Sequence, residues 1–68
     1  MVTDRLLKQA EAAEVLNVQS RTLESWRMRG IGPRFVRYTA RAVRYRPADL
    51  HAFLERHEVA PAREQGDE

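Results

Sequence analysis

The chain has no cysteine and only two histidines, and these shortages exclude several kinds of site. Without cysteine it forms no disulfide and no cysteine-ligated zinc site. His51 and His57 are too few for a metal cluster, so we expect no metal and no cofactor. No apolar run approaches the roughly 18 residues that a membrane span needs, and no secretory signal is visible. We therefore expect a cytoplasmic protein from a bacterium or a phage, with no membrane partner.

Groups that carry catalysis are also missing. The sequence has no glycine-rich loop of the kind that cradles phosphates, and no nucleophile is matched with a histidine. Glu11 and Glu14 are better interpreted as the solvated face of a helix than as an acid–base pair. We predict that the protein is not an enzyme.

Charge is distributed unevenly along the 68 residues, a length that allows one small domain. The net charge is only +2, but residues 20–46 contain one acid, Glu24, and eight arginines: Arg21, Arg27, Arg29, Arg34, Arg37, Arg41, Arg44 and Arg46. The local balance is therefore +7, and the rest of the chain carries −5. A basic middle between acidic ends is typical of a protein that binds a polyanion. The alternative is a solvated surface whose charges are scattered by chance.

Two short helices are predicted in the first half of the chain. The run "QAEAAEVL" from Gln9 to Leu16 is rich in helix formers, and Asn17 suits a left-handed C-terminal cap. The second helix opens at Gln19 and Ser20, either of which can cap it, and closes at Gly30. About three residues join the two helices, which is the helix-turn-helix pattern. Leu16, Val18, Leu23 and Trp26 are expected to fill the space between them, with Ala13 allowing close approach.

The spacing of apolar residues changes from a helical to an alternating pattern after "GIGP". Val36 with Tyr38, and Val43 with Tyr45, give two short alternating runs that favour strands, and residues 39–41 read as the hairpin turn between them. Pro47 then begins a third helix, whose apolar face is Leu50, Phe53 and Leu54. The predicted fold is α+β and mainly α, a winged helix-turn-helix over residues 1–57. Residues 58–68 are predicted to form a disordered tail.

Residues 11–54 resemble the small excisionase-type helix-turn-helix proteins, which are related to the DNA-binding domain of the MerR family. The shared marks are "EAAEVL", a turn ending in valine, "RTLESW", "RGIGP" and "VRYRPADL". The resemblance implies a recombination directionality factor that binds repeated attachment sites in double-stranded DNA cooperatively, bends the DNA and directs an integrase toward excision. A small transcriptional regulator acting at a promoter is the alternative role.

The second helix is expected to enter the major groove, where base edges can be distinguished. Arg21, in its first turn, is predicted to read a guanine or hold a phosphate, and Ser25 lies one turn further on. Met28 either touches a thymine methyl or makes a surface contact. Glu24 either accepts from cytosine or, as we favour, pairs with Arg27 or Arg21. The remaining residues expected to contact DNA from this helix, mostly at phosphates, are Ser20, Thr22, Arg27 and Arg29.

The hairpin is expected to act as a wing carrying Arg37, Arg41 and Arg44, with Arg34 and Arg46 extending the phosphate track. Arg41 resembles the wing residue that excisionases place in the minor groove, whose negative potential attracts arginine. Trp26, Tyr38 and Tyr45 could stack on single-stranded bases, but their spacing favours core packing. His51 and His57 are expected on the surface of the last helix.

Overall fold

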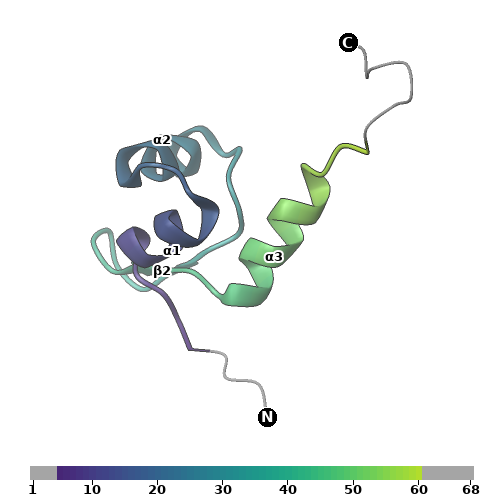
Figure 1. The fold of residues 1–68 in the computed structure, drawn as a ribbon. Coiled ribbons are helices and arrows are strands. Elements are labelled where there is room, and N and C mark those ends of the chain that lie inside the picture. Colours follow the sequence, from purple (N-terminus) through teal and green to yellow (C-terminus); the bar gives the residue numbers. More distant parts are fainter. Residues whose placement is uncertain (1–4, 61–68) are drawn as a thin grey trace.

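The computed structural model describes residues 5–60, which form three helices and a small hairpin (Figure 1). In chain order the elements are α1 (Gln9–Leu16), α2 (Ser20–Arg29), β1 (Val36–Arg37), β2 (Val43–Arg44) and α3 (Pro47–Arg56). This is the predicted winged helix-turn-helix, with the predicted order of elements. Of the expected tail, residues 58–60 follow α3 without regular structure, and residues 61–68 lie outside the described part of the chain, as do residues 1–4.

The turn between α1 and α2 depends on one left-handed residue. Asn17 has φ 59° and caps α1, as its type predicts. The Val18 N–H donates to the Ala13 carbonyl at 3.0 Å, which turns the chain sharply into α2. Gly30, with φ 72°, ends α2 in the same conformation, which glycine adopts without steric cost. Asn17 and Gly30 thus set the residues at which α1 and α2 end.

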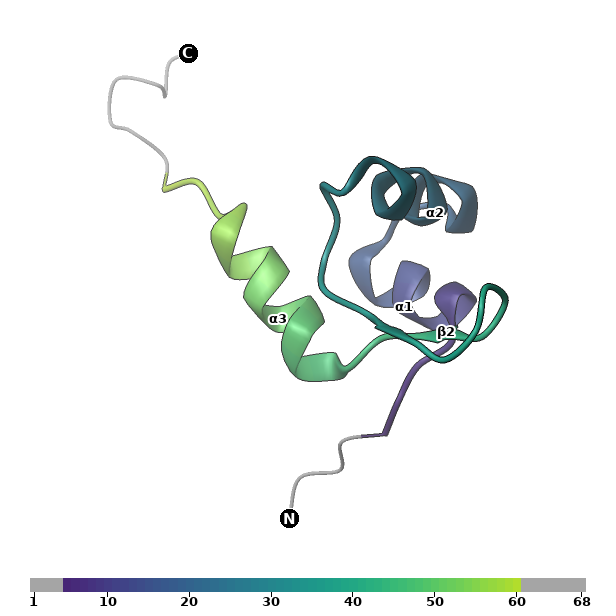
Figure 2. The ribbon, with the colours of Figure 1, turned by 180° about the vertical axis from the view of Figure 1, so that it is seen from behind.

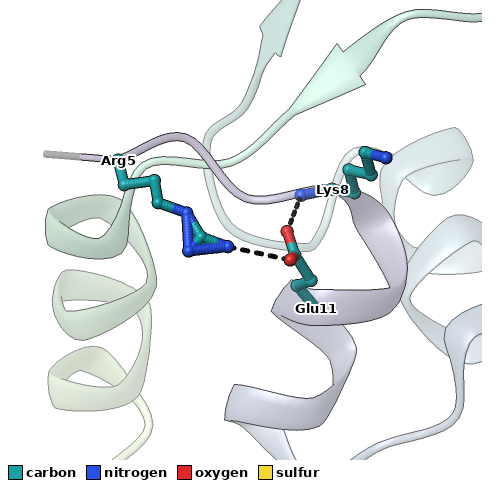
Figure 3. A network of polar contacts seen from close by, with 3 residues as sticks. All are labelled: Arg5, Lys8 and Glu11. Atoms are coloured by element: carbon teal, nitrogen blue, oxygen red, sulfur yellow. Dashed lines mark hydrogen bonds and ion pairs between the residues drawn. The ribbon is translucent and has the colours of Figure 1, made fainter.

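The first turn of α1 is closed by a carboxylate rather than by a hydroxyl. The Glu11 side chain accepts a hydrogen bond of 2.8 Å from the Lys8 backbone N–H and one of 2.9 Å from Arg5 (Figure 3). Both interactions favour the charged carboxylate, and they lower the pKa of Glu11 below its ordinary value of 4.5, the Lys8 bond contributing most. Glu11 therefore ties the strand-like lead-in of the chain to α1.

The hairpin pairs Val36 with Arg44 and Arg37 with Val43 in an antiparallel register. Its turn lies at residues 39–41 as predicted. Because these residues lack the glycine or asparagine usual at such a tip, the Thr39 hydroxyl supports the turn by accepting from the N–H groups of Arg41 and Ala42, at 3.2 and 3.1 Å. Leu7 adds a further bridge on the other side, exchanging two 2.8 Å backbone bonds with Tyr45.

The register decides which aromatic side chains enter the core. Residues directly opposite each other share a face, so Val43 and Tyr45 share theirs with Arg37 and Phe35, while Val36 and Tyr38 lie on the other face. Tyr45 is fully buried and Phe35 packs on it, with ring centroids 6.1 Å apart. Tyr38 is 62% exposed, so the expectation that it packs in the core is wrong.

The core lies where the three helices and β2 meet. Its buried members are Ala12, Ala13, Leu23, Val43, Tyr45 and Leu50, and Leu7, Leu16, Val18, Trp26 and Phe35 pack against them. α3 lies beside the helix-turn-helix pair and contacts it along one side only (Figures 1 and 2). Its Phe53 is buried, with its ring 5.6 Å from that of Trp26. Leu54 was expected to pack as well, but it is 44% exposed and lines open hollows shared with Leu16 and Leu50.

Candidate nucleic-acid interface

One face of α2 is open to solvent and carries the side chains that the sequence singled out. Arg21, Ser25 and Met28 are all exposed, whereas Leu23 on the opposite face is fully buried. Met28 is 76% exposed, so its thioether is accessible from outside the fold. Thr22 is half-buried at the edge of this face. Arg21, Ser25 and Met28 therefore lie on the side of α2 that faces away from the core.

The hairpin supplies a second exposed group of arginines. Arg41 lies at the tip, on the turn that Thr39 supports. Arg37 is exposed and its guanidinium lies 5.4 Å from the centre of the Phe35 ring, which holds the side chain close to the hairpin. Arg44 is half-buried and donates to the Val43 carbonyl at 2.9 Å. These contacts restrict the arginines of the hairpin without neutralising their charge.

A groove of about 540 Å³ separates the start of α2 from the hairpin. The start of α1 and the hairpin tip lie side by side below α2 (Figures 1 and 2). All three elements line the groove, through Lys8, Gln9, Ala10, Ser20, Glu24, Arg27, Ala40, Arg41, Val43 and Arg44. Four of these side chains are basic and one is acidic, so the groove is suited to an extended anion.

Arg27 differs from the other arginines of the basic segment because its guanidinium is directed inward. Its Nη1 donates to Gln9 Oε1 at 2.8 Å and to Tyr45 Oη at 3.1 Å. Its Nε is buried and has no hydrogen-bond partner among the described residues, and the group lies 5.8 Å from the Phe35 ring centre. Sequence reasoning expected Arg27 to hold a phosphate; the structure gives it partners within the fold instead.

The remaining arginines are more accessible. Arg29 and Arg34 are exposed, and neither forms an ion pair within residues 5–60. Arg21 donates from Nε to Gln19 Oε1 at 3.2 Å, which leaves its terminal nitrogens available. Arg46 donates to Asp49 at 3.3 Å and is partly neutralised there.

Two expectations about the start of α2 need correction. Neither Gln19 nor Ser20 caps the helix: Gln19 occupies the cap position without a side-chain bond, and Ser20 Oγ instead accepts from Gln9 Nε2 at 2.8 Å. Glu24 was expected to pair with Arg27 or Arg21. It forms no ion pair with any described residue, because Arg27 faces inward and Arg21 turns toward Gln19.

The aromatic and histidine side chains lie outside this interface, apart from exposed Tyr38. Trp26 and Tyr45 belong to the core or its edge, as expected. His51 and His57 are exposed on the surface of α3, also as expected, and the His57 ring packs on Phe53 with centroids 4.2 Å apart. No cluster of three or more metal-ligating side chains is present within residues 5–60.

Sequence reasoning missed two residues of the groove, Lys8 and Gln9. Both stand where α1 begins, and the sequence pattern there indicated only the start of a helix. The signal that could have identified them is chemical: Lys8 is the only lysine in the chain, and Gln9 is the amide nearest the start of the first helix. Only the folded chain brings them next to Ser20 and Arg41.

Comparison with protein families finds a match over residues 6–58 to the model of a helix-turn-helix domain, and this segment contains every described helix and strand. No curated protein matches the chain, and no solved structure does. Among the described residues, no helix has the length and apolar character required to cross a membrane.

Proposed function

The chain belongs to the helix-turn-helix domain family, a family of small DNA-binding domains, and on this premise we propose that it binds double-stranded DNA through α2 and the hairpin together. α2 enters the major groove, and Arg21, Ser25 and Met28 face the base edges. The hairpin acts as the wing, and Arg41 at its tip enters the adjacent minor groove. Arg29, Arg34, Arg37 and Arg44 hold phosphates on either side, and Thr22 lies near the backbone at the edge of α2.

The groove between α2 and the hairpin is the observation that carries this proposal. When a helix lies in one groove of DNA and a wing lies in the next, a sugar–phosphate strand must pass between them. A channel lined by Lys8, Arg41 and Arg44 occupies that place in this fold. It is open at the surface, and four of its five charged side chains are basic, which suits an approaching row of phosphates.

The biological role we propose is that of an excisionase, a recombination directionality factor of a phage or an integrative element. Several copies bind repeated sites at an attachment region, bend the DNA and direct an integrase toward excision. Bending 20–30 base pairs costs on the order of 1–6 kcal/mol, which several bound copies can share. A domain that presents α2 alone as its reading helix suits such an array. We also propose that the protein acts in the cytoplasm of a bacterial cell.

The test is a gel-shift titration on DNA that flanks the nearest integrase gene, with random duplex as competitor. A ladder of discrete, cooperative complexes that resist the competitor supports the excisionase role. One complex at a promoter supports instead a small transcriptional regulator, and no preference for any duplex refutes specific DNA binding.

A matched pair of arginine variants separates the interface from general charge. Arg21→Ala removes a charge from the open face of α2, and Arg56→Ala removes one from α3, where the guanidinium lies over the Phe53 ring. We expect Arg21→Ala to weaken specific binding by about tenfold or more and Arg56→Ala to leave it within about twofold. Equal losses would place the interface elsewhere.

A further inference from the structure

A chain of hydrogen bonds runs from the core to the groove. Tyr45, which is fully buried, accepts at Oη from Arg27 Nη1, and the same nitrogen donates to Gln9 Oε1 at 2.8 Å. Gln9 Nε2 then donates to the hydroxyl of Ser20 at 2.8 Å and approaches the Ser20 carbonyl at 3.2 Å. Gln9, Ser20 and Arg27 all line the groove.

The chemistry of the four groups fixes the direction of every bond in this chain. Arginine only donates, so the Gln9 oxygen must face Arg27 and the Gln9 nitrogen must face Ser20. This removes the ambiguity between the two ends of an amide side chain. Because the Ser20 oxygen accepts from Gln9, the hydrogen of its hydroxyl remains to be donated. The acceptor nearest in sequence on the groove wall is Glu24, and the structure contains no hydrogen bond between the two.

We propose that the chain Tyr45–Arg27–Gln9–Ser20 sets the Ser20 hydroxyl as a hydrogen-bond donor for a phosphate of the DNA backbone, with Gln9 and Arg27 acting as positioning residues. A phosphate oxygen only accepts, so a hydroxyl whose hydrogen is free matches it. Lys8 and Arg41 on the same groove add positive charge around that position. The inference rests on the proposed binding of double-stranded DNA and names one phosphate contact and the residues that prepare it.

The same series of hydrogen bonds connects the helices and the wing, whose spacing must be kept when they contact DNA. Gln9 belongs to α1, Ser20 and Arg27 to the two ends of α2, and Tyr45 directly follows β2. The Arg27 guanidinium also lies over the ring of Phe35, which precedes β1. Arg27 therefore acts from inside the fold, where it links α2 to α1 and to the base of the wing.

The proposal is tested on a 20-base-pair duplex of random sequence, because a phosphate contact does not depend on sequence. Gln9→Met keeps the length of the side chain and removes both of its hydrogen bonds. We expect it to weaken binding about tenfold, the effect of one hydrogen bond to a charged group. Ser20→Ala should weaken binding equally, and the double variant should lose no more than either single one. Ala52→Met, which adds a side chain of the same size on the exposed surface of α3 and away from the groove, is the control and should bind within about twofold of the unaltered chain.

A second variant tests the proposal even if Gln9→Met unfolds the domain. In Gln9→Glu the carboxylate accepts hydrogen bonds from both Arg27 and the Ser20 hydroxyl. The Ser20 hydroxyl then presents only its oxygen, a hydrogen-bond acceptor, to the phosphate. Ala10→Glu adds the same negative charge at the neighbouring position and leaves the hydrogen bonds of Gln9 intact. We expect Gln9→Glu to melt no lower than the unaltered chain but to bind about tenfold more weakly than Ala10→Glu.

The outcomes separate this inference from the function on which it rests. If the unaltered chain binds no duplex at all, the proposed function fails. If it binds, and the losses from Gln9→Met and Ser20→Ala simply multiply, or Gln9→Glu equals Ala10→Glu, the function stands and the positioning chain is refuted.

Discussion

The salt dependence of DNA binding can be predicted from the arginines that the fold leaves available. Of the eight arginines in residues 20–46, Arg27 faces inward and Arg46 pairs with Asp49. The six that remain are Arg21, Arg29, Arg34, Arg37, Arg41 and Arg44. Each phosphate neutralised contributes about −0.9 to the slope of log K against log salt, so the expected slope is about −5. If Lys8, which lines the groove, also neutralises a phosphate, the expected slope becomes about −6.

The magnitude is large enough to measure easily. A slope of about −5 lowers the affinity roughly a thousandfold between 50 and 200 mM salt. Fluorescence anisotropy with a labelled 20-base-pair duplex, titrated at four or five sodium chloride concentrations, gives the slope directly. All measurements on the unaltered chain should be made at one pH, so that only the salt concentration changes.

Two single variants test the assignment of individual arginines. Arg41→Ala should weaken binding several-fold and make the slope shallower by about one, because Arg41 is exposed at the wing tip. Arg46→Ala should leave the slope nearly unchanged, because its charge is directed to Asp49. A slope shallower than about −2 would refute the count of phosphate contacts. An Arg46→Ala slope that changes as much as that of Arg41→Ala would refute the distinction between paired and free arginines.

Three further predictions concern stability and the groove. Leu23→Ala removes a fully buried side chain and should cost about 2–5 kcal/mol of unfolding free energy, a large share of what a domain of this size has; a calorimetric loss below about 1 kcal/mol would contradict the packing. The pKa of Glu11 is lowered in the folded chain, so the stabilisation that its carboxylate gives should be present above pH 4.5 and lost as the pH falls through its folded-state pKa. Glu11→Gln should therefore lower the melting temperature at pH 7 but not at pH 2. The control variant Glu14→Gln should change the melting temperature at neither pH. Glu24→Gln removes the only acid on the groove wall and should tighten binding to all duplexes several-fold, whereas loss of preference for one sequence would show that Glu24 reads a base.

The helices could be predicted almost to the residue because their ends are set by local signals. Asn17, Gly30 and Pro47 each act through their own backbone preferences, and these preferences do not depend on the rest of the fold. The faces of the hairpin could not be predicted in the same way. Alternation shows that Val36 and Tyr38 share a side, but only the pairing register places that side away from Val43.

Partners and exposure depended on distant parts of the chain and were predicted less well. Leu54 has the spacing of a packed residue, yet it is 44% exposed. Arg27 stands four residues after buried Leu23, so helical spacing places it nearer the core than Arg29, but this spacing does not show what it binds. Its partners are Gln9 and Tyr45, each 18 residues away, which supply two oxygens to its guanidinium group. Contacts of this kind appear only when the elements are packed.

The open face of α2 also limits what one copy of the domain can discriminate. Arg21, Ser25 and Met28 are the exposed side chains that we propose reach bases, and among them only Arg21 can make a bidentate contact. One good bidentate pair discriminates by about 1–3 kcal/mol, whereas specific DNA-binding proteins exceed their non-specific binding by about 4–10 kcal/mol. On this proposal a single copy falls short of the usual specificity, while the proposed phosphate contacts would give it ample affinity. Repeated sites occupied by several copies remove this shortfall, because the small discrimination of each copy is then added over the array.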